Sequence, residues 1–158
     1  MDKIVVQTED FDLTKEVELI KSTNSNLGAV VSFIGTVRDL EGESLVSLTL
    51  EHYPGMTEKS LSTIADKARN KWQLESITII HRVGTLSVGD QIVLVITSSK
   101  HRQEAFDSCN FIMDYLKTEA PFWKKEISDK QEKWVGKRDH DEKQKNAGKI
   151  KSLDLLVY

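Results

Sequence analysis

The run GAVVSFIGTV at residues 28–37 constrains the fold of this chain more than any other stretch. It is nearly continuously apolar and rich in β-branched residues, which is typical of a strand buried on both faces. Such a strand needs layers packed against it. Three segments with helical periodicity can supply them, beginning after Asp12, at Thr57 and near residue 100. The sequence therefore predicts a sheet covered by helices.

Further strands are predicted between these helices. Residues 45–50 (LVSLTL) alternate with period two, which predicts a half-buried strand paired with the run before it. We expect Ser98 or Ser99 to cap the long helix and Pro121 to end it. Because helices alternate with strands, we predict an α+β (mixed α/β) fold with a mixed, partly antiparallel sheet. The remaining predicted strands lie at residues 3–7, 76–80, 91–97 and 122–127.

The composition is that of an ordinary globular chain. Its 158 residues, 39% hydrophobic and 30% charged, suffice for one domain with its own core. The single cysteine, Cys109, excludes an intrachain disulfide and favours a reducing, cytoplasmic compartment. It falls on the apolar stripe of the long helix, where an unreactive thiol is expected. We expect neither a signal peptide nor a membrane span.

Basic charge gathers toward the C-terminal end. Residues 124–151 hold 10 Lys and Arg against 6 Asp and Glu, although the whole chain has a formal net charge of −3. A solvated tail is one explanation, and a site for an anionic ligand is the other. We divide the chain into a domain at residues 1–138 and a tail of unassigned role at residues 139–158.

Three lysines surround a short apolar patch in the segment DYLKTEAPFWKKE, residues 114–126. Lys117 falls in the last turn of the long helix, where a cation also suits the helix dipole. Successive side chains of a strand point to opposite faces, so Lys124 shares a face with Phe122 and Lys125 points the other way. A lysine beside apolar walls can have a lowered pKa. The segment is a candidate anion pocket with a reactive lysine.

Two further basic groups are candidates for binding an anion. Lys100, His101 and Arg102 open the long helix at its positive end, which is unfavourable unless an anion lies against them. The alternative is a solvated turn paired with Glu104. Arg38 follows the first apolar run, where a guanidinium can bind an oxyanion or simply pair with a neighbouring carboxylate.

The histidines give no sign of a metal site. His52 and His81 lack the spacing of metal ligands, and the sequence contains no CxxC or HExxH. We interpret both as structural side chains. The sequence predicts neither a metal nor a cofactor.

Several longer motifs together resemble one known family. In chain order within residues 3–138 they are GAVVSFIGTVRD, LTLEHYPGMTEKSL, IIHRVGTLSVGD, TSSKHRQEAF, FIMDYLKTEAPFWKKE and KWV. On these motifs the chain resembles the large, catalytic subunits of molybdopterin synthase, the MoaE-type family. The resemblance implies an α/β hammerhead fold. It also implies a homodimer that binds two small ubiquitin-like sulfur-carrier subunits, giving a heterotetramer.

The resemblance implies an activity as well, that of a sulfurtransferase. The carrier's C-terminal Gly-Gly thiocarboxylate would pass its sulfur to cyclic pyranopterin monophosphate, and two transfers would form the dithiolene of molybdopterin. Lys117 and Lys124 match the family's catalytic lysines, so no cysteine of the chain itself is needed. The positions that match substrate-binding residues are Thr36, Val37, Arg38, His101, Arg102, Lys125, Glu126 and Arg138.

The spacing of two of these residues has a geometric consequence. Arg102 and Lys117 are 15 residues apart on one predicted helix. At roughly 1.5 Å per residue this separates them by about 22 Å, more than a monophosphorylated pterin spans comfortably. We therefore predict a composite site at the homodimer interface, with His101 and Arg102 supplied by the other protomer.

Two other functions fit parts of the sequence. A non-catalytic module that binds a pterin phosphate or a ubiquitin-like partner would keep Arg38, His101 and Arg102 but tolerate the loss of Lys117. Nucleic-acid binding through the basic C-terminal segment and Trp134 is disfavoured by the acidic body of the chain. We expect neither a nucleic acid nor a membrane as a partner.

Overall fold

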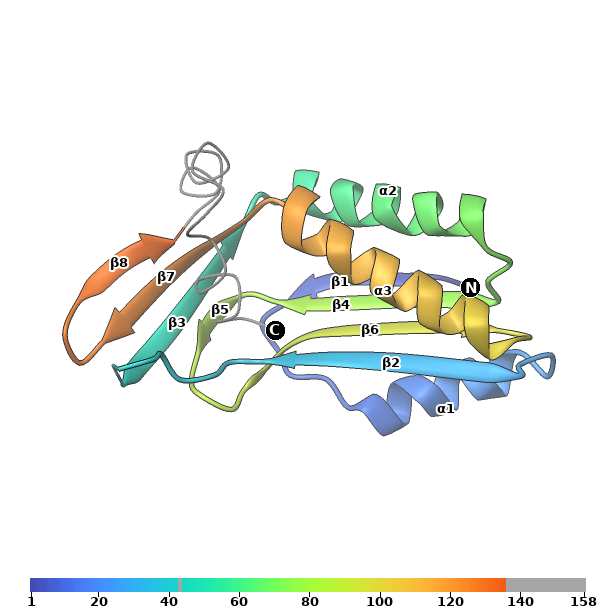
Figure 1. Ribbon diagram of the computed structural model, residues 1–158, viewed down its shortest axis with the longest axis horizontal. Helices are drawn as coiled ribbons and strands as arrows, with labels where there is room; N and C mark the ends of the chain where they lie inside the picture. The colour runs from blue at the N-terminus through green and yellow to red at the C-terminus, as the bar shows by residue number, and fades with distance from the viewer. Residues whose placement is uncertain (43, 136–158) are drawn as a thin grey trace.

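The computed structural model describes residues 1–42 and 44–135, so the predicted tail at 139–158 lies outside the described residues (Figure 1). The described strands form two sheets, in the orders β1-β4-β6-β2 and β5-β3-β7-β8. This confirms the predicted α+β class. The helices are α1 (Leu13–Thr23), α2 (Met56–Lys71) and α3 (Arg102–Glu119), and the strands are β1 (Lys3–Gln7), β2 (Ala29–Thr36), β3 (Leu45–His52), β4 (Ser76–Arg82), β5 (Gly84–Leu86), β6 (Gln91–Ser99), β7 (Phe122–Ser128) and β8 (Glu132–Val135).

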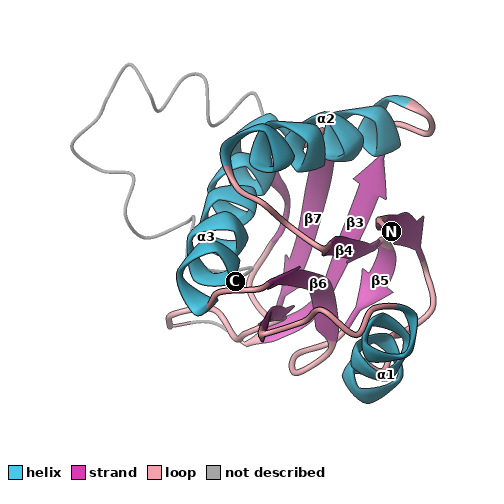
Figure 2. Cartoon of the chain, turned by 90° about the vertical axis from the view of Figure 1, so that its right-hand side faces the viewer, coloured by secondary structure: helices cyan, strands magenta, loops and turns pink. Residues whose placement is uncertain are grey.

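The first sheet is covered on both faces. Helices α2 and α3 lie on one face and α1 lies on the other (Figure 2). Alternate residues of β6 face the two cores: Val93 and Val95 pack with α2 and α3, whereas Leu94 and Ile96 pack with α1. A continuous apolar run is required here because neither face of the strand meets water.

Strand β2 occupies a different place from the one its sequence predicts. It is an edge strand paired with β6, and most of its side chains are half-buried, so both faces are covered as predicted but full burial is not found. Helices still lie over both of its faces: Val31 and Phe33 pack on the α2–α3 core, and Val30 and Ile34 on the α1 core. The apolar run reflects these two contacts, while the open edge leaves the side chains partly exposed.

Strand β3 does not pair with β2, contrary to the prediction. It pairs antiparallel with β5 and β7 in the second sheet. The chain leaves the first sheet after β2: the amide of Val37 donates to the Asp90 carbonyl at 2.9 Å, and the carbonyl of Val37 accepts from the Gly89 amide at 2.7 Å. The period-two pattern specified the buried face of β3, with Leu48 and Leu50 inside, but not its neighbour.

The predicted cap of α1 is confirmed, but the predicted cap of α3 is not. Asp12 caps α1 as predicted, accepting a backbone N–H at 3.2 Å. The predicted cap of the long helix was wrong, because Ser98 and Ser99 belong to β6 and His101 precedes the first helical residue without a side-chain cap. The Ser99 hydroxyl instead lies 2.5 Å from the Glu104 carboxylate. It joins the strand to the first turn of the helix.

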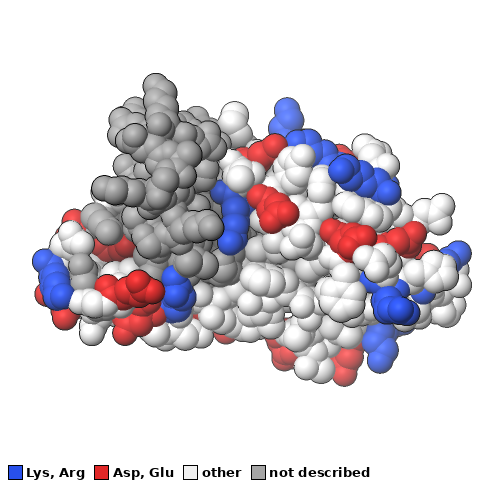
Figure 3. All heavy atoms as spheres, viewed as in Figure 1, with Lys and Arg blue, Asp and Glu red and all other residues white. Residues whose placement is uncertain are grey.

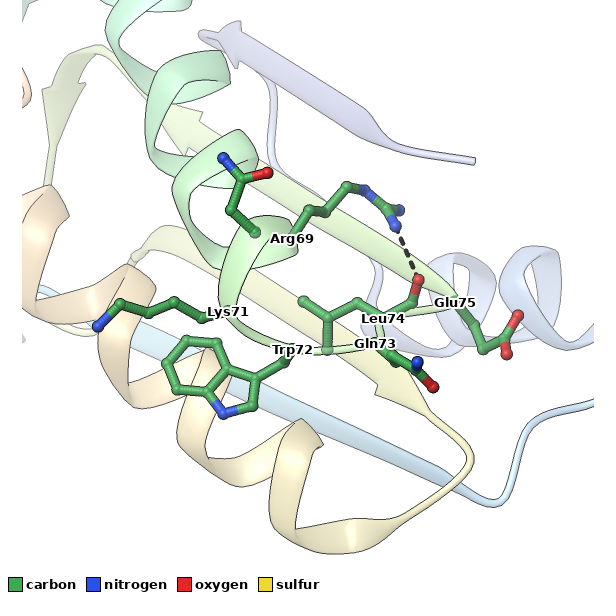
Figure 4. Close-up of a pocket in the computed structure, with 7 residues that line it drawn as sticks. Arg69, Lys71, Trp72, Gln73, Leu74 and Glu75 are labelled. Atoms are coloured by element: carbon green, nitrogen blue, oxygen red, sulfur yellow. Dashed lines mark hydrogen bonds between the residues drawn. The ribbon is translucent and has the colours of Figure 1, made fainter.

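The N-terminal end of the chain is fastened to the end of α2. Arg69 donates to the Asp2 carboxylate from Nε at 2.6 Å and from Nη2, and its Nη1 donates to the Leu74 carbonyl at 2.7 Å. Figure 4 shows this last bond at the edge of a hollow lined by residues 69–75. Burial opposes ionisation of Asp2, but the bonds from Arg69 and from the Ile77 amide hold the pKa of Asp2 below its ordinary value.

Asp2→Asn is expected to lower the free energy of unfolding at neutral pH by about 1 kcal/mol, because the ion pair it breaks is partly exposed. The folded pKa is depressed, so this contribution is present above the ordinary value of 3.8 and is lost as the pH falls through the folded value. Urea unfolding of both proteins at stepwise lower pH measures the difference. Equal stability at neutral pH would contradict the assignment.

The surface over α2 and α3 carries charges of both signs. Acidic and basic side chains lie close together on the described part of the face in Figure 3, and Lys67 and Glu119 form an ion pair of 2.9 Å. A continuous basic stripe, as expected for contact with a nucleic-acid backbone, is not seen on that described surface. In residues 1–42 and 44–135 no helix has the length and apolar character needed to cross a membrane.

Candidate functional site

The two predicted catalytic lysines lie on either side of the turn that joins α3 to β7. Lys117 is exposed in the last turn of α3, and Lys124 is half-buried in β7. Pro121 separates the helix from the strand, as predicted. This end of α3 lies where the chain passes from the first sheet to the second (Figure 1). Two ammonium groups from different elements thus flank one junction.

The neighbouring lysines of β7 point to opposite faces, as the alternation predicts. Lys124 is paired with Leu50 of β3 and shares its face with Phe122 and Glu126, which is only 3% exposed. On the other face, Lys125 forms an ion pair with Glu132, and its ammonium lies 5.6 Å from the centre of the Trp134 ring. Only Lys124 therefore faces the apolar interior of the second sheet.

Thr57, in the first turn of α2, is hydrogen-bonded to the turn between Lys117 and Lys124. The Thr57 hydroxyl donates to the Pro121 carbonyl at 3.1 Å and accepts from the Tyr53 amide at 3.0 Å. Thr57 is fully buried, and the ring of Tyr53 lies 6.3 Å from that of Trp123, measured between centroids. Sequence analysis missed Thr57 as a site residue. Its only signal was a place at a helix start, and its contact with Pro121 is tertiary.

A buried histidine packs against the start of β7. His81 is 1% exposed, and its ring stacks on Phe122 with centroids 3.7 Å apart and planes inclined by 17°. Burial lowers the pKa of His81 to about 3; its bond to the Arg82 carbonyl opposes this, and the nearby charges of Lys124 and His52 lower the pKa further. His81 is therefore neutral at physiological pH, in agreement with the structural role predicted for it.

His52, the second histidine interpreted as structural, lies beside β7. His52 is the register partner of Phe122, and its Nε2 lies 3.5 Å from a carboxylate oxygen of Glu58 in the first turn of α2. It thus joins β3 to α2, which also fits a structural side chain. Both histidines and Thr57 surround the residues that lead from Lys117 to Lys124.

The predicted residues 36–38 lie where the chain leaves β2 for the second sheet. Val37 is 2% exposed and packs with Leu50, the register partner of Lys124, whereas Thr36 and Arg38 are exposed. The predicted alternative, an ion pair between Arg38 and an acidic neighbour, is not found within the described residues. Asp39 instead accepts the backbone amides of the following turn, at 2.6 Å and 3.0 Å. The Arg38 guanidinium is available to an anion.

His101 and Arg102 lie at the opposite end of α3 from Lys117, and both are exposed. Their position is fixed by a close approach at Gly28, where an added Cβ would lie 1.9 Å from the Lys100 carbonyl oxygen. Within one chain the fold does not bring them to the lysine junction. Arg138, the last predicted site residue, lies outside the described residues.

Cys109 faces the core between α3 and the first sheet and is 5% exposed. Burial raises the pKa of its thiol to about 11, although a hydrogen bond with Thr97 acts in the opposite direction. The thiol stays protonated at neutral pH and does not act as a nucleophile. This agrees with the expectation that Cys109 is unreactive.

Cys109→Ala is expected to leave the activity that the resemblance implies within about twofold of the parent. It should cost about 1 kcal/mol of stability, because it removes a small buried side chain. Product formation by equal amounts of folded protein, together with a thermal unfolding curve, measures both effects. Loss of transfer with intact folding would show that the thiol takes part in the reaction.

A family model described as MoaE protein matches residues 6–119. The match covers more than half of the chain and so shows the class of protein to which this fold belongs. The chain belongs to the MoaE family.

Individual relatives carry a more specific name. The chain is 53% identical over 140 residues to the molybdopterin synthase catalytic subunit of Vibrio cholerae, covering 88% of this chain and 93% of that protein. Among solved structures, it is similar to molybdopterin cofactor biosynthesis protein E from Burkholderia multivorans, at 50% identity and a TM-score of 0.77 over 93% and 96% of the two chains. It is also similar to a molybdopterin synthase from Staphylococcus aureus, at 34% identity and a TM-score of 0.79 over 86% and 98%. These likenesses agree with the fold that the resemblance implied.

Proposed function

We propose that this chain is the catalytic subunit of a molybdopterin synthase. It transfers sulfur from the C-terminal Gly-Gly thiocarboxylate of a small ubiquitin-like carrier to cyclic pyranopterin monophosphate, and so forms the dithiolene of molybdopterin. A relative that is 53% identical over 140 residues has this name. The observation that supports the mechanism best is the placement of Lys117 and Lys124 on either side of one fastened turn.

The charges of the reactants account for two lysines. The carrier's thiocarboxylate and the substrate's phosphate are both anions, so a pocket that joins them needs cations at more than one point. Lys117, exposed at the end of α3, orients or protonates the substrate as its ring opens. Without substrate, the same amine can be acylated by the carrier. Lys124, half-buried beside apolar side chains, offsets charge that develops on the thiocarboxylate.

The carrier's tail reaches the lysines along the aromatic side chains at the start of β7. Phe122 and Trp123 are half-buried there, and Tyr53, beside Trp123, is 56% exposed. An extended Gly-Gly segment has no side chains, so it can pass close to these rings. The apolar patch between the lysines thereby guides an anionic terminus to the two ammonium groups.

The substrate-binding arginine and histidine at the start of α3 serve the site of the other protomer. Within one chain, Arg102 and Lys117 occupy the first and last turns of α3, about 22 Å apart along the axis. In a two-fold dimer, contact of Arg102 with the partner's site requires the reciprocal contact, so the two α3 helices lie side by side and antiparallel. Phe106, on α3 and 60% exposed, is then covered by the dimer.

The remaining predicted residues have different parts in this proposal. Thr36 and Arg38 are exposed, and we assign them contacts with the substrate phosphate. Val37 and Glu126 are 2% and 3% exposed and shape the wall of the pocket. Lys125 points to the opposite face of β7, where its ion pair with Glu132 holds the strand beside the pocket. We place the reaction in the cytoplasm because one cysteine in 158 residues is typical of a reducing compartment. The domain boundary near residue 138 stays a prediction.

Reconstitution tests the function. The purified chain is mixed with cyclic pyranopterin monophosphate and a carrier ending in Gly-Gly thiocarboxylate, and molybdopterin is quantified; a carrier with an ordinary carboxylate is the control. We expect product with the thiocarboxylate alone. If the chain binds the carrier but makes no product, the chain is a non-catalytic binding module.

A further inference from the structure

We propose that His81 is a positioning residue for the Lys124 ammonium, acting through its ring stack on Phe122. The proposal rests on the function assigned above to Lys124. In this proposal His81 does not touch the reacting atoms. It determines the position of β7, the strand that carries Lys124.

The stack is the first step of the argument. His81 is the last residue but one of β4 in the first sheet, and Phe122 is the first residue of β7 in the second. Their rings therefore join two sheets whose described strands do not pair with each other. The centroids are 3.7 Å apart and the planes are nearly parallel, at 17°. A contact of this kind determines both the distance of the Phe122 ring from His81 and the tilt of the Phe122 ring.

The orientation of the imidazole is fixed independently. Its Nδ1 lies 2.8 Å from the Arg82 carbonyl oxygen, and a carbonyl accepts only, so Nδ1 carries the proton in the neutral ring. The ring is also almost fully buried, at 1% exposure. His81 therefore presents a buried aromatic ring, oriented by a hydrogen bond, near the end of β4.

The lysine follows from Phe122 by strand geometry. Residues two apart on a strand share a face, so Lys124 emerges on the side where Phe122 meets His81. The charge of Lys124 is also one of the causes that lower the pKa of His81. Because His81 is neutral, it adds no second positive charge beside the Lys124 ammonium. A displacement of about 1 Å at such a group can cost on the order of 100-fold in rate, so the position of Phe122 matters to the chemistry.

Two variants separate the stack from the hydrogen bond. His81→Phe keeps an aromatic ring on Phe122 and loses the donor to the Arg82 carbonyl. His81→Asn keeps a donor near the Nδ1 position and loses the ring. A purely structural role ranks the variants by stability alone, because each leaves either a buried carbonyl unsatisfied or a cavity.

We expect His81→Asn to lower kcat about tenfold or more with KM for the pterin within about threefold, whereas His81→Phe stays within about threefold in both. The second readout is labelling of the full chain by an amine-specific reagent, with each lysine followed by mass spectrometry. In His81→Asn, Lys124 should label at least about threefold faster, since it leaves its half-buried position. The exposed Lys15 and Lys59 are internal controls.

Phe122→Leu removes the stack from the other side and should reproduce the behaviour of His81→Asn. The double variant should then show no further change in Lys124 labelling, because both substitutions remove one interaction. Folded His81→Asn with parental kcat and parental Lys124 labelling overturns the proposal. Equal loss of kcat in both His81 variants, with unchanged labelling, also overturns it and leaves His81 a core residue. Labelling needs no turnover, so a chain that makes no molybdopterin would refute the proposed function without deciding the role of His81.

Discussion

Lys117→Ala should lower molybdopterin formation by at least about 100-fold, the usual cost of removing one group that protonates or stabilises developing charge at a reacting centre. Lys117 is exposed in the last turn of α3, so the substitution removes a side chain without opening a cavity. We therefore expect folding and carrier binding to be retained. Product formed per active dimer, with saturating thiocarboxylated carrier, measures the effect.

Lys21→Ala is a matched control for this variant. Lys21 is likewise an exposed lysine in the last turn of a helix, α1, so it shares the helix-dipole contribution of Lys117 but not its place at the junction. We expect parental activity from it. If Lys117→Ala also kept parental activity, Lys117 would be an ordinary helix-terminal lysine, and the reaction would depend on Lys124.

The local part of the site could be predicted from sequence. Pro121 ends α3 because it removes a donor and clashes with the preceding turn, and alternation along β7 sends Lys124 and Lys125 to opposite faces. Neither inference needs a contact between distant residues. Both were confirmed, and they place Lys117 and Lys124 on two elements around one turn.

The remainder depends on contacts that sequence periodicity does not encode. Residues 45–50 showed a strand with one apolar face, but an alternating pattern is satisfied by any neighbour that covers that face. The partner of β3 was decided by the turn at Val37, which binds the backbone of residues 89–90. For the same reason the stack of His81 on Phe122, 41 residues away, had no local signal.

The cap of α3 failed for a different reason. Serines before a helix are good caps, but Ser98 and Ser99 are fully buried at the end of a central strand. The Ser99 hydroxyl instead donates a hydrogen bond to the Glu104 carboxylate in the first helical turn. The helix consequently starts at Arg102 and keeps His101 and Arg102 exposed, where they can meet a second protomer.

Mixed dimers test the composite site. Arg102→Ala alone should lower activity about 10-fold to 100-fold, since it removes a charge-assisted contact to an anion. When Arg102→Ala and Lys117→Ala chains are unfolded and refolded together, a heterodimer has one site with both residues intact and one with neither. Random pairing makes half of the dimers heterodimers, so activity should recover to about one quarter of the parental value.

The control is the mixture of Lys117→Ala with Lys124→Ala. Both lysines come from the same chain at the junction of α3 and β7, so no site in that mixture is complete and no recovery is expected. Recovery in the first mixture and none in the second is the pattern that only a shared site produces. If the first mixture also stays inactive, although sedimentation shows that the chains have exchanged, Arg102 acts within its own chain. The substrate would then have to bridge about 22 Å along α3, which a monophosphorylated pterin cannot do, so Arg102 would bind something other than the substrate held by Lys117.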